Sequence, residues 1–492
     1  MLWWRRGNPP DASALPTLLL GAGEAGRAMV RALRASRGYG LVPVGFLDDN
    51  PRLRRACGLP VLGRLDQVAE VARRTGVRVA LVTIPSLPAS RIAALTDACA
   101  SAGLLVRHLP SFLAAVERDM RLSDLRGVRV DELLGREEIH IASHRARGLI
   151  KGRRVLVTGA GGSIGSELCR QVKRLQPAAL YLLDHDESNL HGLHLELGGS
   201  GVLDSDEIII ADIRDRPRLA QIFAETLPDI VFHAAAHKHL PLLERHPCEG
   251  VKTNVLGTHH LVDLAVAYGT ARFVLISTDK AADPTSVLGG TKRLAELVVQ
   301  AAAGGATCMA TVRFGNVLGS RGSLLSVLAD QVAKDQPITV THPNVTRFFM
   351  TIEEAVGLVL ESATMAEYAE TFVLDMGEPV QIVDLVHKYA AAMHLPDVTI
   401  RFTGLRPGEK LNEKLFSDSE VRQRTAHPKV WATRASEVPA DMPELLGELY
   451  AAAAANDPVA TLAQLHRLLP EYQPSRQPVT PASVGAPYAD GF

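Results

Sequence analysis

Two segments of this chain share one layout, in which an apolar run leads into a glycine-rich turn and then into a helical pattern. The first segment begins near residue 17 and carries the turn GAGEAG, and the second begins near residue 153 and carries GAGGSIG. A strand, a glycine-rich turn and a helix form the opening unit of a dinucleotide-binding α/β fold. The length of 492 residues allows about two to four domains. We therefore predict an α/β protein with two Rossmann-type domains in tandem.

The first unit is predicted to be a small domain over residues 14–110, after a disordered start over 1–13. Its second strand ends at Asp48, and its predicted strands are Thr17–Leu20, Val42–Leu47, 77–84 and 104–108. No recognisable catalytic cluster follows its glycine turn. Two alternatives stay open for this domain: a nucleotide site with a regulatory role, and a structural Rossmann unit with an empty site.

Composition limits the classes of function. Hydrophobic residues make up 47% of the chain and the net charge is −1, so we expect large cores and no basic field for nucleic acid. The five cysteines are widely spaced, which argues against a disulfide framework or a zinc site and favours the cytoplasm. No apolar run reaches the ~20 residues of a spanning helix. We expect no transmembrane segment, with Trp3 and Trp4 as the candidates for a peripheral membrane contact.

Strand–helix alternation resumes at residue 154 and predicts a parallel, doubly wound sheet. The predicted strands are 154–158, 180–184, 207–212, 229–235, 272–278 and 308–315. Beyond about Ser320 the pattern becomes mixed, as expected for a small substrate-binding lobe. The predicted divisions are a linker over 111–150, a nucleotide-binding domain with its lobe over 151–435, carboxy-terminal helices over 436–470 and a disordered tail over 471–492.

The second glycine turn carries the clearer cofactor signal. The turn and the start of its helix contain Gly159, Gly162, Ser163, Ile164 and Gly165, and N–H groups at a helix start stabilise a pyrophosphate. The next strand ends in Asp184, nineteen residues after the last of these glycines, where a carboxylate can accept hydrogen bonds from an adenosine ribose. Because this carboxylate would repel a 2′-phosphate, the pattern favours NAD over NADP.

Two later strand ends are also expected beside the cofactor. Asp212 and Ile213 lie at the end of the third predicted strand, and Asp212 either meets the adenine edge or caps a helix, with neither alternative favoured. Ala234 and Ala235 end the fourth predicted strand, and we expect the loop there to border the nicotinamide ribose.

A polar group at the end of the fifth strand marks the predicted reaction centre. Thr278, Asp279 and Lys280 follow an apolar run, and Lys292 lies on the next predicted helix. Leu288, four residues before Lys292, shares its helix face. Taken alone, Leu288 would be a core residue and Lys292 a solvated lysine. The dinucleotide turn in the same sheet favours a catalytic role, because active sites lie at such carboxyl ends.

From about residue 111 onward the chain resembles the nucleotide-sugar 4,6-dehydratases of capsule, lipopolysaccharide and glycoprotein-glycan biosynthesis, a branch of the extended short-chain dehydrogenase/reductases. The upstream unit resembles the soluble amino-terminal domain of this family, without the membrane helices that usually precede it. Leu288 is a departure, since family members commonly have methionine or tyrosine there. The resemblance covers most of residues 125–431 and rests on the runs LRGVRVDELLGRE, VLVTGAGGSIGSELCRQ, FHAAAHKHLPLLE, TNVLGT, ISTDKA, GGTKRLAE, VRFGNVLGSRGS, TRFFMTIEEA, LRPGEKLNEKL and HPKVW.

The resemblance implies a reaction in which NAD⁺ takes hydride from C4 of a sugar, water leaves across C5–C6 and hydride returns to C6. It assigns Lys280 as the base at C5, Asp279 as the acid toward the C6 hydroxyl and Thr278 as a partner of the C4 oxygen. We expect burial beside Lys292 and the nicotinamide to lower the pKa of Lys280, because a base must be neutral. Proton transfer from Lys280 itself is the alternative to Asp279. With Leu288 in place of a phenol, the C4 base is open between Asp279 and Thr278 with a water held by Lys292.

The matched runs also contain candidate substrate contacts. Guanidinium groups suit diphosphates, although each arginine taken alone is more typical of a surface ion pair. The candidates are Lys238, Asn316, Arg321, Arg347 and Arg406, with Glu409 orienting one of the arginines. No metal is predicted, because acidic partners are missing beside the nearby histidines His233, His237 and His239.

These observations lead us to expect NAD-dependent 4,6-dehydration of a UDP-linked N-acetylhexosamine, with UDP-N-acetylglucosamine as the first candidate. The rival enzyme is a nucleotide-sugar 4-epimerase or oxidoreductase, which keeps the cofactor site but does not need the Asp-Lys pair. The non-enzymatic rival is a nucleotide-sensing scaffold, which Leu288 and the first domain encourage. We also expect a homo-oligomer in the cytoplasm.

Overall fold

The computed structural model describes residues 15–35, 41–84, 95, 98–99, 102–108, 144–198, 205–320, 322–334, 336–392, 398–433 and 438–474. The chain divides into two compact units, of which the first carries the amino-terminal sheet and the second the large sheet. The predicted start at 1–13, most of the predicted linker and Arg321 lie outside the described residues.

The first unit is a six-stranded sheet with the order β3-β4-β2-β1-β5-β6. Its glycine turn closes tightly: Gly21 has a φ of +106°, and a Cβ on Gly26 would lie 2.1 Å from the carbonyl oxygen of Gly21. The predicted strands match the observed ones to within two residues at each end. The elements are β1 (Leu15–Leu20), α1 (Glu24–Ala35), β2 (Leu41–Leu47), β3 (Arg55–Ala56), β4 (Leu59–Gly63), η2 (Leu65–Gln67), α2 (Val68–Thr75), β5 (Val79–Val82) and β6 (Leu105–His108).

The second unit contains a nine-stranded sheet with the order β20-β21-β17-β12-β11-β10-β7-β8-β9. The strands are β7 (Arg154–Thr158), β8 (Ala179–Asp184), β9 (Ile208–Ile210), β10 (Ile230–His233), β11 (Arg272–Ile276), β12 (Cys308–Arg313), β17 (Ala369–Leu374), β20 (Arg422–Arg424) and β21 (Val430–Thr433). All neighbours pair in parallel except at β20 and β21. The order reverses between β7 and β10, and ligands of doubly wound sheets bind at such a switch point.

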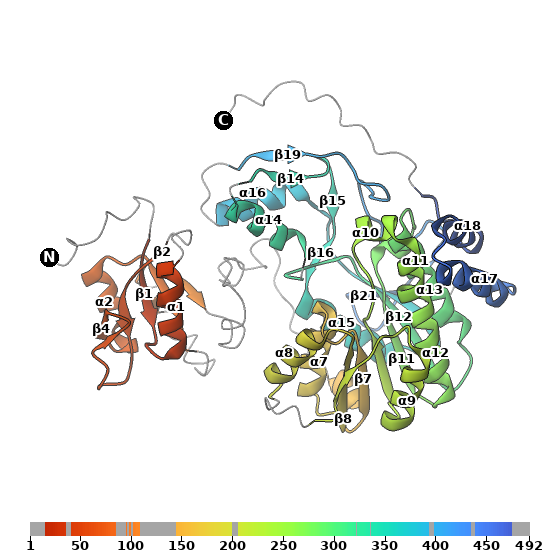
Figure 1. The fold of residues 1–492 in the computed structure, drawn as a ribbon, viewed down its shortest axis with the longest axis horizontal. Helices are drawn as coiled ribbons and strands as arrows, with labels where there is room; N and C mark the ends of the chain where they lie inside the picture. Colours follow the sequence, from red (N-terminus) through yellow and green to blue (C-terminus); the bar gives the residue numbers. More distant parts are fainter. Residues whose placement is uncertain are drawn as a thin grey trace, which may run out of the picture. The chain divides into compact units, whose positions relative to one another are not determined.

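Helices cover both faces of this sheet (Figure 1). One face packs against α6 (His144–Ile150), α7 (Ser163–Arg174), α8 (Glu187–Glu196) and α15 (Ile352–Met365). The other face packs against α9 (Arg216–Thr226), α12 (Gly257–Ala267) and α13 (Val287–Ala301). An outer group packs on this second layer and consists of α10 (Leu240–Arg245), α11 (Pro247–Gly250), the π-helix η4 (Val251–Leu256), α17 (Met442–Ala454) and α18 (Pro458–Leu468).

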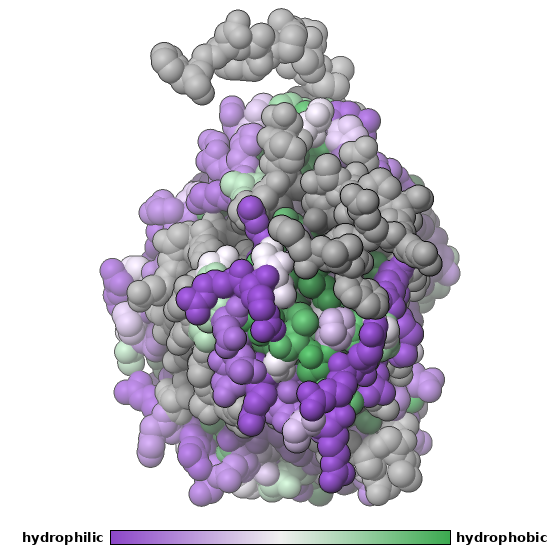
Figure 2. Space-filling model, turned by 90° about the vertical axis from the view of Figure 1, so that its left-hand side faces the viewer, coloured by the Kyte–Doolittle hydropathy of each residue, from purple (hydrophilic) through white to green (hydrophobic). Residues whose placement is uncertain are grey.

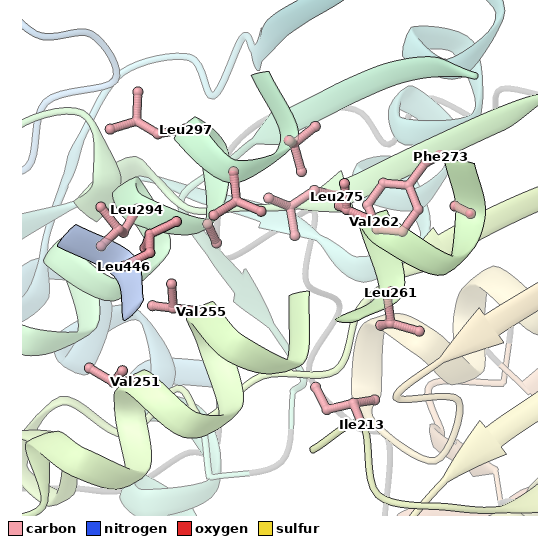
Figure 3. Packing of buried hydrophobic residues seen from close by; sticks show 14 of the residues in the cluster. Ile213, Val251, Val255, Leu261, Val262, Phe273, Leu275, Leu294, Leu297 and Leu446 are labelled. Carbon is pink, nitrogen blue, oxygen red and sulfur yellow. The ribbon is translucent and has the colours of Figure 1, made fainter. Parts of the chain in front are cut away.

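The core on the α13 side shows why these helices are held firmly. Figure 3 shows Phe273 and Leu275 of β11 in one apolar cluster with side chains of α12, α13 and α17, among them Leu261, Leu294 and Leu446. These side chains are buried, and each full burial of a large aliphatic or aromatic group stabilises the fold by about 1.5–3 kcal/mol. The strand that carries the predicted reaction centre is therefore anchored in the interior.

Short elements beyond residue 315 form the region predicted as a lobe. They include three two-stranded sheets, β13 with β16, β14 with β19 and β15 with β18. Their bounds are β13 (Asn316–Leu318), α14 (Leu324–Ala333), β14 (Ile338–Val340), β15 (Thr346–Arg347), β16 (Phe349–Thr351), β18 (Val380–Gln381), α16 (Ile382–Ala392) and β19 (Ile400–Phe402).

Two predicted boundaries need correction. Residues 144–150 of the predicted linker form α6, whose Ala146 and Ile150 are buried against α15, so this segment belongs to the second unit. The predicted tail begins too early, because Tyr472 is only 1% exposed and packs near Gly290 of α13. The next residue, Gln473, donates a backbone hydrogen bond to the carbonyl of Pro284. A single aromatic residue thus extends the ordered chain past the point at which its composition turns polar.

A buried ionic cluster ties the helix α13 to the ends of two strands. Glu296 of α13 accepts hydrogen bonds from Arg313 of β12 at 2.7 and 2.6 Å, and from the Ser277 hydroxyl beyond β11 at 2.6 Å. Arg313 also pairs with Glu420 at 2.8 Å. Burial opposes the charge of Glu296, but Arg313, Arg293 and the Ser277 hydrogen bond together outweigh this effect and lower the pKa of its carboxyl. The cluster is therefore an ion pair within the protein interior.

Polar residues cover most of the described surface that Figure 2 presents, with a small hydrophobic group near its centre. Among the described residues, none of the helices combines the length and apolar content that crossing a bilayer would take.

Replacing Arg313 with methionine should destabilise the second unit by about 3 kcal/mol, because the buried carboxylates of Glu296 and Glu420 would lose their shared cation. Glu296 would keep Arg293 as a cationic partner. Urea denaturation measures the loss. The control is Arg467→Met, which removes an exposed pair with Glu448 and should cost at most about 1 kcal/mol. Equal losses in the two variants would contradict a structural role of the buried pair.

Candidate active site

The second glycine turn has the tight geometry that the sequence predicts. Gly159 has a φ of +69°, and a Cβ on it would lie 2.5 Å from the backbone nitrogen of Ala235. A Cβ on Gly165 would lie 2.0 Å from the carbonyl oxygen of Gly159. Gly162 is the N-cap residue of α7, which begins at Ser163. The turn thus brings bare backbone together at the switch point.

A cavity of about 370 Å³ opens over this turn. Asp184 lies at its edge, where Oδ2 accepts a hydrogen bond from the Gly161 nitrogen at 2.9 Å and Oδ1 accepts one from the Asp186 nitrogen at 3.0 Å. Of the residues predicted to bind the cofactor or substrate, the cavity is lined by Gly159, Gly162, Ser163, Asp184, Asp212, Ile213, Ala234, Ala235 and Lys238. Ile164 packs instead against the core below the turn.

Asp212 is held by an arginine that the sequence reading overlooked. Arg214 donates to both carboxylate oxygens of Asp212, at 3.0 and 2.9 Å from Nε, and also pairs with Glu249. Hydrogen bonding to Arg214 lowers the pKa of the Asp212 carboxyl. The helix cap weighed as an alternative is supplied by Asp215, which accepts a hydrogen bond from the Arg218 nitrogen at the start of α9. Asp212 is therefore a charged group on the cavity wall.

The predicted reaction centre lies in a short turn beyond β11. The strand ends at Ile276, and Thr278 caps the 3₁₀ turn η5 (Asp279–Ala281). Thr278 donates its hydroxyl to Asp279 Oδ1 at 2.9 Å, and Lys280 Nζ donates to the same oxygen at 3.0 Å. The strand stops two residues before Thr278, so the side chains of Asp279 and Lys280 are not forced to opposite faces of the sheet. The acid and the amine that the sequence assigned to the sugar are thus hydrogen-bonded to one another.

Two features of α13 hold this turn in place. Ser286 caps the helix by accepting a hydrogen bond from the Gly289 nitrogen at 3.1 Å. A Cβ on Gly289 would lie 2.5 Å from the carbonyl oxygen of Lys280, so the absence of a side chain there lets the helix approach the turn. The conformation of the Asp-Lys pair thus depends on the first turn of the next helix.

The charge of Lys280 differs from the expectation. Burial lowers the pKa of its amine, but the carboxylates of Asp279 and Glu413 outweigh burial and raise the net pKa above the ordinary value. The expected lowering beside Lys292 is therefore wrong for this arrangement, since Lys292 Nζ donates instead to the Ile276 carbonyl at 2.6 Å. Without a change in its surroundings, Lys280 holds its proton.

Glu413 is a site residue that the sequence reading missed. Its Oε1 lies 3.8 Å from Lys280 Nζ, and its side chain is 2% exposed. The signal was present in the run LRPGEKLNEKL, which contains two glutamates beyond Arg406. Only the first of them, Glu409, drew attention as a partner for arginine.

Lys292 and His233 are both buried and close to one another. Burial lowers the pKa of Lys292 to about 8. Burial and the charge of Lys292 lower the pKa of His233 to about 3. The His233 ring bridges Thr158 and Thr258 at 2.7 and 2.9 Å, so it joins the ends of β7 and β10 to α12. His233 is thus a neutral structural residue beneath the cofactor turn.

Leu288 packs as a core residue. It is 6% exposed and lies in a small cluster with Leu243 and Val287, against Leu240 and Leu462. These surroundings agree with the alternative in which Leu288 is part of the core. No hydroxyl takes the place of a phenol at this helix position.

The predicted substrate residues fall into different settings. Arg347 donates to Glu409 Oε1 at 2.8 Å, and Glu409 Oε2 accepts a hydrogen bond from the Arg406 nitrogen, so Glu409 joins both arginines. Arg406 itself is exposed. Asn316 was expected to face the sugar or the diphosphate, but its Oδ1 accepts a hydrogen bond from Lys280 Nζ at 3.3 Å. Asn316 is therefore a neighbour of the reaction centre.

Comparison with known proteins divides the chain in the same way. Residues 155–435 match the family described as polysaccharide biosynthesis protein, and residues 2–110 match a CoA-binding domain. The chain is 40% identical to the probable polysaccharide biosynthesis protein EpsC of Bacillus subtilis, over 87% of this chain and 72% of that protein. The solved structure of Pen from Bacillus thuringiensis has a TM-score of 0.54 and 31% identity, and the match covers 58% of this chain and 90% of that one. The predicted Rossmann-type fold is confirmed.

Two further relatives match the second unit and differ in activity. The chain is 31% identical to the inverting UDP-N-acetylglucosamine 4,6-dehydratase of Campylobacter jejuni, over 55% of this chain and 80% of that protein. It is 29% identical to the UDP-glucose 4-epimerase of Rickettsia felis, over 54% of this chain and 78% of that protein. Similarity therefore indicates nucleotide-sugar chemistry of the dehydratase or epimerase kind.

The stability of the second unit should fall as the pH drops from about 6.5 toward 3, because the unfolded chain protonates His233 and the folded chain does not. From pH 6.5 to 5 this residue should account for about 2 kcal/mol of the free energy of unfolding. His233→Gln should remove that part of the acid dependence, while the exposed His144→Gln should leave it unchanged. Urea denaturation at each pH measures it, and an unaltered acid dependence in His233→Gln would refute this assignment.

Proposed function

This chain belongs to the polysaccharide biosynthesis protein family, and we propose that it is an NAD-dependent 4,6-dehydratase of a UDP-N-acetylhexosamine, with UDP-N-acetylglucosamine as the first substrate to test. The observation that carries the proposal is the contact between Asp279 and Lys280 at the carboxyl end of β11. Elimination of water needs one group that takes the C5 proton and another that protonates the departing hydroxyl. An amine and a carboxyl 3.0 Å apart supply both.

The cavity over the glycine turn fits a dinucleotide. A volume of about 370 Å³ lies within the range of small-molecule sites, and the tight turn at Gly159 and Gly165 leads directly into the start of α7, where N–H groups suit a pyrophosphate. Asp184 presents a carboxylate for a ribose hydroxyl and would repel a 2′-phosphate, which supports NAD. When bound, NAD would supply hydride acceptance at C4 and hydride return at C6.

Proton transfer can pass along the hydrogen bonds of the turn. Asp279 Oδ1 takes its proton from Lys280, which already donates to it. Thr278 and a water held by Lys292 pass the C4 hydroxyl proton to solvent, from which Lys280 regains a proton at the end of the cycle. Asp279 then protonates the C6 hydroxyl, which leaves as water. Lys280, once neutral, removes the C5 proton and returns it to C5 after hydride reaches C6. The relay through Thr278 takes the place of the phenol that Leu288 lacks.

Substrate binding is assigned to the residues around Glu409. The ion pair between Arg347 and Glu409 fixes one guanidinium group, while Arg406 stays exposed and available to a diphosphate. We also assign Lys238, on the wall of the cavity over the glycine turn, and Arg321 to substrate binding. Asn316 acts on the sugar through Lys280.

The decisive experiment is incubation with UDP-N-acetylglucosamine, followed by mass spectrometry of the product. We expect a product lighter by one water. A product of unchanged mass but altered C4 configuration would favour the 4-epimerase, which the Rickettsia relative represents. Absence of any reaction with UDP-sugars would leave the nucleotide-sensing scaffold as the better description.

Lys280→Ala should lower kcat by about 10²–10⁴-fold and abolish deuterium exchange at C5, because the variant lacks the base. Lys173→Ala, which removes a half-exposed lysine on α7, is the matched control and should retain activity. Turnover with unchanged C5 exchange in Lys280→Ala would remove Lys280 as the base.

Gly165→Ala should weaken NAD binding at least about tenfold, because its Cβ would lie 2.0 Å from the Gly159 carbonyl and force the turn to move. Gly192→Ala is the control, since nothing lies within 4 Å of a Cβ at that position on α8. Isothermal titration calorimetry with NAD measures both. Equal affinities in the two variants would place the cofactor elsewhere.

A further inference from the structure

Glu413 reaches the reaction centre from a segment more than 130 residues further along the chain. Its Oε1 lies 3.8 Å from Lys280 Nζ and its Oε2 lies 4.0 Å from Lys410 Nζ. Among the described residues, Oε2 has no hydrogen-bond partner. A buried, ionised carboxylate oxygen without a partner is costly, whereas a protonated one costs much less.

The reaction centre therefore contains one amine between two buried carboxyl groups. Asp279 is fully buried, and its Oδ2 also has no hydrogen-bond partner among the described residues. If both carboxyl groups were ionised beside the Lys280 ammonium, the group of three would carry a net negative charge in the interior. Two neighbouring carboxylates resist ionising together, so one of them holds a proton.

The charges around Glu413 favour it as the group that holds this proton. Its closest cation, Lys280, is shared with Asp279, whose Oδ1 is nearer at 3.0 Å. Arg347 is paired with Glu409, and Lys410 also faces Asp283 at 3.7 Å. Burial raises the pKa of Glu413, and Asp279 raises it further, against the opposing effect of Lys280, Arg347 and Lys410.

We propose that Glu413 is protonated in the resting enzyme and so enables Lys280 to give its own proton to Asp279. This inference rests on the proposed dehydratase function and adds a positioning residue to it. One proton moves from Lys280 Nζ to Asp279 Oδ1 across their existing hydrogen bond, which leaves a neutral amine and a carboxylic acid. That single transfer prepares the base for C5 and the acid for the C6 hydroxyl together.

An ionised Glu413 would prevent this transfer. Its negative charge 3.8 Å from Nζ would stabilise the ammonium form of Lys280, with which C5 deprotonation cannot begin. A neutral Glu413 removes that attraction and keeps its own proton throughout the cycle. The reaction needs a protonated Asp279 and a neutral Lys280, and the transfer of one proton from Lys280 to Asp279 produces both.

Glu413 also has a route by which its proton can exchange. It borders a cavity of about 480 Å³ whose other walls include Phe348, Phe416 and Trp431, and the charged side chains Asp418 and Arg422. We assign proton exchange between the carboxyl group and solvent to this cavity. Rising pH should deprotonate Glu413 through this cavity and switch the enzyme off.

The test compares Glu413→Gln, which is permanently neutral, with Asp418→Asn, which neutralises an exposed carboxylate on the same cavity. In the pH profile of kcat, the wild type and Asp418→Asn should lose activity at alkaline pH. Glu413→Gln should retain at least about one third of wild-type kcat at neutral pH, and its alkaline loss should shift upward by about one unit or more. A loss of about 100-fold at every pH would overturn the proposal, because it would mean that an ionised Glu413 is needed.

Infrared spectroscopy separates this inference from the proposed function, because it needs no turnover. The substrate-free wild type should show a protonated-carboxyl band at neutral pH that is absent from Glu413→Gln and present in Asp418→Asn. If that band is found but UDP-sugars are not dehydrated, the proton assignment stands and the substrate assignment fails. If the band is the same in all three proteins, Glu413 is not the protonated group and the proposal is wrong.

Discussion

The geometry of the reaction centre depends on the buried carboxylate of Glu296. It binds Arg313 at the end of β12 and the hydroxyl of Ser277 beyond β11, and it is carried by α13. Ser277 directly precedes the turn of Thr278, Asp279 and Lys280, so the position of this turn is fixed by an ion pair on the far side of the strand. Such a pair contributes little net stability over an apolar core, but losing one partner is expensive. Its effect is to allow a single arrangement of strand end and helix.

The same cluster connects the sheet to the segment that supplies Glu413. Arg313 reaches Glu420, whose Oε2 also accepts a hydrogen bond from the Ser417 nitrogen. Glu413 lies only a few residues before this anchor. The buried ionic cluster thus positions the Asp279–Lys280 turn through Ser277 and the segment of Glu413 through Glu420. A proton balance among three groups needs distances fixed in this way, since a shift of one ångström changes the interaction energies substantially.

Local patterns predicted those features whose cause is local. The glycines at 159 and 165 marked the cofactor turn in the sequence, and the structure shows that a side chain at either position would clash with nearby backbone. Apolar periodicity located the parallel strands to within a few residues. The raised pKa of Lys280 arises from Asp279 and then from Glu413, and the second of these could not be predicted because Glu413 is distant in sequence. The predicted start of the tail at residue 471 was wrong because it also depends on a contact between residues distant in sequence. Tyr472 is held by a contact with α13 that the polar composition around it does not reveal.

An aliphatic residue at position 288 is compatible with this arrangement of charged groups. In the packed structure its side chain fills an apolar cluster beside α10, one helical turn before Lys292. Lys292 Nζ donates a hydrogen bond to the Ile276 carbonyl and so stabilises the strand end. A phenol at position 288 would have to leave the cluster to reach the sugar, and it would bring a hydroxyl into an apolar site without need. With Thr278 bonded to Asp279 and Asp279 to Lys280, the acid and the base of the proposed elimination already lie at the strand end, and neither of them needs a hydroxyl at position 288.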